Sequence, residues 1–267
     1  MTVPENYVIR GGLEGRERLR LMSRVLAPGT EALLSRAHIP PDARCVDVAC
    51  GGGDVTKILA RHVAPGGSVI GIDRDADIVA IARAEAAADG VANVRFEAVD
   101  LQQWTPPEPV DIVYARFILT HVSNPDAIAK RFFGWLRRGG RVIVEDIDYR
   151  GCFVFPDSEA FRRSCQLYCE VARRNGGDPE IGAKLPHILK GAGFEDISVS
   201  INQPVATDGD VKLIQHVTLL RTADAIVQAS LATRAEIDAL SADLYTISTD
   251  GESLMALPRI VQVSASR

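Results

Sequence analysis

The sequence lacks the features of a membrane, secreted or nucleic-acid-binding protein. Its 267 residues contain no apolar run longer than a strand, so no transmembrane helix is expected. The first residues include no basic segment followed by an apolar one, so no secretory signal is expected. Five irregularly spaced cysteines predict neither a disulfide framework nor a metal site. A net charge of −5 argues against a nucleic-acid partner. These absences predict a cytoplasmic protein.

An alternation of strand-like and helical patterns is present instead. Hydrophobic residues make up 46% and charged residues 24%, which is typical of a globular chain with an ample core. Strand-like apolar runs lie at 44–49, 67–73, 93–98, 110–115 and 140–147, separated by helical patterns near 53–63, 75–89 and 124–138. Such alternation predicts an α/β fold with a parallel sheet that is wound on both faces.

The rest of the chain is mainly helical. The patterns predict helices at 13–26, 179–192, 208–229 and 233–245, a helix that Asp157 caps and that runs through Ala172, and a strand at 195–202. The final run, 257–266, alternates apolar and polar residues, which is typical of a half-buried edge strand.

A glycine loop follows the first strand-like run. Gly51 and Gly53 match the first two glycines of a dinucleotide-binding loop, but Thr56 stands where the third is expected. No lysine follows the last glycine, so a phosphate loop is excluded as well. About 20 residues later, Asp73 ends a second apolar run, where it could hold a ribose. The pattern favours a nucleoside ligand over a plain tight turn.

Five motifs in register resemble those of the class I S-adenosylmethionine-dependent methyltransferases. They are Val46–Gly53, Gly71–Asp73, Phe96–Leu101, Val110–Phe117 with His121-Val122 after it, and Leu136–Glu145. The likeness is greatest to the ubiquinone/menaquinone-biosynthesis-like small-molecule methyltransferase group. There, a segment similar to Tyr7–Gly12 and Glu17–Leu21 folds over the cofactor.

The resemblance implies a fold and a division of the chain. The fold is a Rossmann-like, seven-stranded, doubly wound sheet with its last strand antiparallel, in a single domain spanning 1–267. The implied parts are a helical segment over the cofactor (1–40), a cofactor-binding core (41–150), helical substrate-cap insertions (151–178 and 206–250) and a terminal edge strand (251–267).

The resemblance also implies residues that bind the cofactor, S-adenosyl-L-methionine. They are Tyr7, Asp47, Ala49, Cys50, Gly51, Gly53, Asp73, Arg74, Val99, Asp100, Leu101, Ala115 and Arg116. In the family the acid at Asp73 holds the ribose and the acid at Asp100 faces the adenine amino group. Either aspartate could instead cap a helix. Arg116 could hold the cofactor carboxylate or form a surface ion pair.

Methyl transfer from a sulfonium depends mainly on holding three atoms in line, and a base is needed only for acceptors that lose a proton. His121 is the first candidate base, with a structural histidine as the equal alternative. Asp148 and Tyr149, beyond the fifth strand, are the second choice. Phe153 and Phe155 could wall an acceptor pocket or pack the insertion onto the sheet.

The function expected is methylation of a small, apolar or aromatic metabolite by a monomer or homodimer, without nucleic acid or membrane as partner. A protein or tRNA methyltransferase is the alternative of the same chemistry. An NAD-dependent oxidoreductase and a non-catalytic cofactor-binding protein are the alternatives of other classes. The acceptor and the atom that is methylated stay open.

Overall fold

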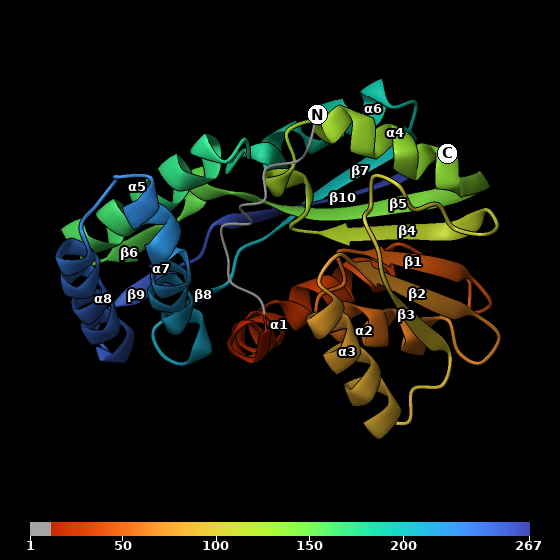
Figure 1. Cartoon of the computed structure of the whole chain (residues 1–267). Coiled ribbons are helices and arrows are strands. Elements are labelled where there is room, and N and C mark those ends of the chain that lie inside the picture. The colour runs from red at the N-terminus through yellow and green to blue at the C-terminus, as the bar shows by residue number, and fades with distance from the viewer. Residues whose placement is uncertain (1–11) are drawn as a thin grey trace.

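A seven-stranded sheet organises the computed structural model, which describes residues 12–267 (Figure 1). Its strands, in the order β3-β2-β1-β4-β5-β10-β7, are Val94–Ala98, Ser68–Asp73, Arg44–Val48, Val110–Arg116, Leu136–Asp148, Arg259–Ser266 and Glu195–Asn202. The first five run parallel, whereas β10 is antiparallel to both of its neighbours. The predicted α/β fold with an antiparallel last strand is therefore confirmed.

The position predicted for the last strand is wrong. β10 lies between β5 and β7, and β7 forms the edge. The polar residues of β10 suggested a solvated face, but Gln262 and Ser264 are buried. The Gln262 amide donates to Glu145 Oε2 (2.7 Å) and Ser264 Oγ accepts from Arg141 Nη1 (3.1 Å). Hydrogen-bond partners inside the protein thus replace water along this strand.

Helices cover both faces of the sheet (Figure 1). The apolar sides of α1 (Gly12–Arg36) and α2 (Asp54–His62) pack on one face. Those of α4 (Pro125–Trp135) and α6 (Leu185–Gly191) pack on the other, and α3 (Ala76–Ala88) packs beside β3. The two packed faces make the sheet doubly wound, as predicted.

Helix α1 is longer than the pattern predicted. It continues through Pro28 to Arg36, although proline removes one backbone hydrogen bond of a helix. Tertiary contacts offset that loss. Leu33 and Leu34 are buried against the sheet, and the Thr30 hydroxyl donates to Glu145 Oε1 at 2.7 Å.

A second group of helices lies beyond the carboxyl ends of β4 and β5, at the left of Figure 1. Helices α5 (Glu159–Arg174), α7 (Asp210–Gln228) and α8 (Arg234–Thr249) share an apolar cluster that includes Phe161 and Leu219. A three-stranded sheet that the sequence did not predict supports them, formed by β6 (Phe153–Phe155), β9 (Leu254–Ala256) and β8 (Val205–Ala206). We call these elements the cap. Short 3₁₀ turns, η1 (Leu119–His121), η2 (Tyr149–Gly151) and η3 (Ile181–Lys184), follow β4, β5 and α5.

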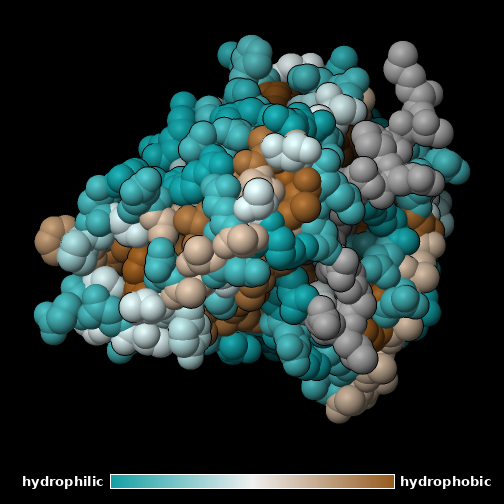
Figure 2. Space-filling model, turned by 60° about the vertical axis from the view of Figure 1, so that its left-hand side comes forward, coloured by the Kyte–Doolittle hydropathy of each residue, from teal (hydrophilic) through white to brown (hydrophobic). Residues whose placement is uncertain are grey.

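Two expectations for the cap segment are wrong. Ser158, not Asp157, caps α5, because its side chain accepts from the Phe161 amide at 3.2 Å. Phe153 and Phe155 neither wall a pocket nor pack inward, being 48% and 66% exposed on β6. Figure 2 shows that hydrophobic side chains on the face it draws are interrupted by hydrophilic ones. Within residues 12–267, no helix combines the length and apolarity needed to cross a bilayer.

Candidate active site

The glycine loop turns sharply between β1 and α2. Ala49, Gly51 and Gly53 all have positive φ, of 55°, 52° and 76°. A Cβ on Gly53 would lie 2.7 Å from the ring of Phe96, so the tight approach of loop and β3 excludes any side chain there. The loop therefore turns at the carboxyl end of the sheet, where ligands of open α/β sheets bind, and side chains of α1 pack against it at Gly51 and Gly52.

Asp73 holds this loop. Its Oδ2 accepts from the Gly51 amide at 2.9 Å and its Oδ1 from the Asp75 amide at 3.0 Å. The capping role suggested for Asp73 belongs to Asp75, which accepts from the amides of Asp77 and Ile78. Burial raises the pKa of Asp73. Each carboxylate oxygen can accept more than one hydrogen bond, so both oxygens can still take ribose hydroxyls.

Asp100 stands on the neighbouring turn. Its Oδ1 accepts from the Gln102 amide at 2.8 Å, so it fills a local turn-stabilising role in this structure. The Val99 amide donates to the Asp73 carbonyl at 2.8 Å, which joins the end of β2 to the turn beyond β3. Val99 and Leu101 pack at the margin of the sheet's core. Val99 thus lies beside Asp73, and Asp100 and Leu101 follow it on the turn.

Asp47 and Cys50 lie behind the loop. Asp47 Oδ2 accepts from Thr56 Oγ1 at 2.6 Å, and burial raises the pKa of Asp47 to about 7. Thr56, which replaces the third glycine of a dinucleotide loop, therefore bonds the first turn of α2 to β1. Burial raises the pKa of Cys50 well above its usual value, so this side chain is a thiol. Both side chains support the loop from within.

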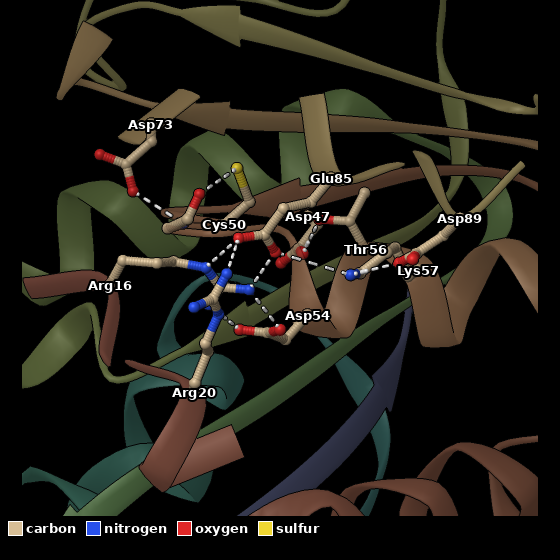
Figure 3. Close-up of polar contacts among 11 residues, drawn as sticks. Arg16, Arg20, Asp47, Cys50, Asp54, Thr56, Lys57, Asp73, Glu85 and Asp89 are labelled. Atoms are coloured by element: carbon tan, nitrogen blue, oxygen red, sulfur yellow. Dashed lines mark hydrogen bonds and ion pairs between the residues drawn. The ribbon is translucent and has the colours of Figure 1, made fainter. Parts of the chain in front are cut away.

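An arginine that the sequence reasoning missed fastens α1 to the glycine loop (Figure 3). The buried Arg16 guanidinium donates two hydrogen bonds to Asp54 (2.5 and 2.8 Å) and two to Glu85 (2.9 and 2.5 Å). Arg20, one turn further, also donates to Glu85 at 2.7 Å. The i, i+4 spacing of the two arginines was the available signal. These bonds hold α1 against α2 and α3.

A buried carboxylate, Glu145, joins four segments behind the site. It accepts from Tyr114 Oη (2.5 Å), Thr30 Oγ1 (2.7 Å) and Gln262 Nε2 (2.7 Å). Arg116 donates to the same Thr30 hydroxyl at 3.3 Å and its guanidinium lies 5.7 Å from the Phe117 ring. Sequence reasoning recognised Glu145 only as the end of a motif. Ala115 is fully buried within β4.

A cavity lies between the sheet and the cap, and we call it the acceptor cavity. It contains about 580 Å³ of empty space with its open mouth included. It is lined by Arg18, Met22, Val25, Leu26, Phe117, Thr120, His121, Ile147, Tyr149, Tyr168, Ile214, Thr218, Leu257, Pro258 and Ile260. The surroundings are apolar except for a few side chains.

Two of the three predicted catalytic residues line this cavity. His121 ends η1, and its pKa is lowered to about 4 because the imidazole is desolvated and faces the positive charges of Arg18 and Arg74. Tyr149 stacks on Tyr168 with ring centroids 4.5 Å apart, and burial raises its pKa well above the usual value. At neutral pH, His121 is therefore an uncharged imidazole that could accept a proton.

Asp148, the third, lies outside the cavity lining. It accepts from Arg150 Nε at 2.8 Å and from Arg259 Nη2 at 2.9 Å. Although burial opposes it, these hydrogen bonds and charges lower the pKa of Asp148. The Asp148 carboxylate is thus paired with two arginines outside the cavity, and the structure does not place it where an acceptor would bind.

Of the predicted cofactor residues, those on β1, β2 and β4 and the turns beyond them lie together at the carboxyl edge of the sheet. Arg74 is exposed and acts electrostatically on His121. Tyr7 lies outside the described residues. Arg18, which lines the acceptor cavity, was missed because one arginine in an arginine-rich helix carries no distinct signal.

Comparisons with known proteins agree with this geometry. Residues 39–193 match the family model described as "Methyltransferase domain". A trans-aconitate 2-methyltransferase of Variovorax paradoxus (strain S110) is 28% identical over 257 residues, which cover 89% of this chain and 92% of that protein. Another, of Methylobacterium radiotolerans, is 27% identical over 254 residues, covering 87% and 90%.

A solved structure shares the fold. It is Haemonchus contortus phosphoethanolamine N-methyltransferase 2 in complex with phosphomonomethylethanolamine and S-adenosylhomocysteine. The TM-score is 0.54 at 18% identity, covering 98% of this chain and 55% of that one.

Proposed function

This chain belongs to the methyltransferase domain family and is an S-adenosylmethionine-dependent methyltransferase, and from that premise we propose that it methylates a small molecule bound in the acceptor cavity. The family, the enzyme class and the cofactor expected from the motifs are confirmed. One observation carries the proposal. The cavity is lined both by residues that follow β4, next to the cofactor motifs, and by residues of the cap.

The cofactor residues proposed from the motifs fit S-adenosylmethionine. The glycine-loop backbone would approach the nucleoside, and Asp73, whose oxygens retain acceptor capacity, would hold the ribose. Arg74, Val99, Asp100 and Leu101 would flank the adenine and Arg116 would border the methionine part, whereas Ala115, fully buried in β4, would support the site only from behind. When bound, the cofactor supplies a methyl group on a sulfonium.

The chain's own contribution is mainly positioning. The apolar lining excludes water and holds the acceptor in one orientation, which is the principal requirement of an in-line transfer. For an acceptor that loses a proton, we assign His121 as the base, because its imidazole lines the cavity and is in the proton-accepting form at physiological pH, although a pKa of about 4 makes it a weak base. Tyr149 and Asp148 stay second choices.

The apolar lining of the cavity favours a small apolar or aromatic acceptor over a protein or tRNA, and the net charge of −5 agrees. The relatives named above are trans-aconitate 2-methyltransferases. A small organic acid is therefore the first class of acceptor to test. We further propose a cytoplasmic protein that is a monomer or homodimer, which light scattering on a sizing column would decide.

Titration calorimetry with S-adenosylhomocysteine and with NAD tests the cofactor assignment. We expect the homocysteine compound to bind and NAD to give no heat. Transfer of labelled methyl from S-adenosylmethionine to a panel of small acids, phenols and amines then tests turnover. Tight NAD binding would reinstate an oxidoreductase, and binding without transfer to any acceptor would favour a silent cofactor-binding protein.

A further inference from the structure

Helix α1 directs its arginines to two different sides. Arg16 and Arg20 donate to carboxylates on α2 and α3. Leu19, between them in the sequence, packs against the glycine loop, because its side chain lies 3.2 Å from the position of a Cβ on Gly51. Arg18 lines the acceptor cavity with Met22, Val25 and Leu26, which follow it at intervals of 4, 7 and 8 residues along one helix face. Arg18 thus serves the acceptor side of α1 and not the glycine-loop side.

Arg18 has no acceptor within the described part of the chain. Its Nε is buried without a hydrogen bond. The Nε atoms of Arg131 and Arg259 are also buried and unpaired, but both residues use another nitrogen. Arg131 Nη2 donates to the Trp104 carbonyl at 2.6 Å, and Arg259 Nη2 pairs with Asp148 at 2.9 Å. No hydrogen bond or ion pair of this kind is found for Arg18 among the side chains that the structure describes, those of residues 15–267.

The described residues of the cavity lining also include no anion for this guanidinium. Asp146 lies behind η1, where its oxygens accept from the amides of Thr120 (3.1 Å) and Ile147 (2.9 Å), and burial raises its pKa to about 7. Asp148 is paired with arginines outside the lining. His121 is neutral, and Arg74 adds positive charge beside it. A partly desolvated cation without a counter-charge is costly unless a ligand provides one.

Building on the proposed function, we propose that Arg18 binds a carboxylate of the methyl acceptor, and that this acceptor is a monocarboxylic acid with an apolar body. A guanidinium presents its donors in a planar fork that matches a carboxylate. The rest of the lining is mostly aliphatic or aromatic, which suits the body of such a molecule. trans-Aconitate has three carboxylates, and two of them would lie against apolar side chains.

The test compares acids with their uncharged amides on the protein saturated with S-adenosylhomocysteine. Octanoate, trans-cinnamate and indole-3-acetate are titrated calorimetrically beside octanamide, cinnamamide and indole-3-acetamide, with trans-aconitate included. We expect at least one monocarboxylate to bind about ten-fold or more tighter than its amide, and tighter than trans-aconitate. In Arg18→Gln that preference for the acid should disappear.

Arg24→Gln is the matched control, because Arg24 is an exposed arginine of the same helix that pairs only with Asp210 among the described residues. It should keep the preference. Circular dichroism and urea unfolding verify that Arg18→Gln is folded, and Arg18→Lys, which retains the charge but not the fork, should keep part of the preference.

Three results would overturn the inference: no monocarboxylate binds, the amides or trans-aconitate bind as well as the acids, or Arg18→Gln keeps the preference. If folded Arg18→Gln lost affinity for S-adenosylhomocysteine but kept the preference for the acid, Arg18 would be assigned to cofactor binding and not to acceptor binding. Failure of the wild-type protein to bind S-adenosylhomocysteine would instead refute the proposed function itself.

Discussion

The carboxylate of Asp73 accepts a hydrogen bond from the backbone amide of Gly51, 2.9 Å away, so the residue proposed to hold the ribose also fixes the loop that the cofactor approaches. The two motifs, 22 residues apart, therefore depend on one another. A change at Asp73 should affect both the loop and the ligand.

Replacing Asp73 by Ala should weaken S-adenosylhomocysteine binding at least ten-fold and lower the free energy of unfolding by about 1.5–3 kcal/mol, because charge-assisted hydrogen bonds to two amides are lost. Calorimetry and urea unfolding measure the two effects. Asp75→Ala is the control, since Asp75 caps α3 but lies off the loop. It should cost about 1 kcal/mol of stability and leave the affinity near the wild-type value.

Replacing Gly53 by Ala should destabilise the protein by about 1–2 kcal/mol or more, because φ is 76° and the new Cβ would lie 2.7 Å from Phe96. Movement of the loop should reduce S-adenosylhomocysteine binding as well. Gly134→Ala offers a comparison, since a Cβ in α4 meets nothing within 4 Å there. It should leave binding unchanged and stabilise α4 by up to about 1 kcal/mol. Equal effects at both glycines would contradict this account of the loop.

Replacing Glu145 by Ala should lower the free energy of unfolding by about 3 kcal/mol or more, because three donors lose a buried acceptor, namely Tyr114, Thr30 and Gln262. Urea unfolding followed by circular dichroism measures the loss. The same change at Glu108, which is exposed and pairs with Arg44, should stay within about 0.5 kcal/mol. A small loss at Glu145 would mean that the network adds little to stability.

His121 should make stability depend on pH. Its pKa is about 4 in the folded chain and 6.5 ordinarily, so as pH falls the unfolded chain is protonated first. Its contribution is fully present above pH 6.5 and is lost as pH falls toward 4. Urea unfolding across that window should show a steeper loss in the wild type than in His121→Gln. His187→Gln, at an exposed imidazole, should match the wild type.

Much of the sheet was predictable because it depends on local signals. Apolar runs that end in glycine or aspartate predicted β1, β2 and the loop after β1, and the apolar run before Arg116 predicted β4. Side-chain pairs between distant segments gave no such signal. Arg16 meets Glu85 across 69 residues and Thr30 meets Glu145 across 115, and neither pair leaves a periodic trace in the sequence.

The same limit explains the site. Polar residues on β10 looked solvent-facing because the partners of Gln262 lie in distant elements, on α1, β5 and β7. His121 and Tyr149 could be assigned to the cavity because they directly follow strand ends, where an open sheet binds ligands. Arg18 could not be assigned to the cavity from the sequence, because it is distinguished only by the absence of a hydrogen-bond acceptor for its buried Nε among the described residues.

The place of β10 between β5 and β7 has a consequence for folding. Residues 259–266 close a gap between strands that precede them by more than a hundred and by about sixty residues. Until they dock, both flanking strands present unpaired amides and carbonyls to other chains, which is the usual route to intermolecular pairing. Any lesion that delays this insertion should therefore appear first as self-association of newly made chains, before methylation itself is impaired.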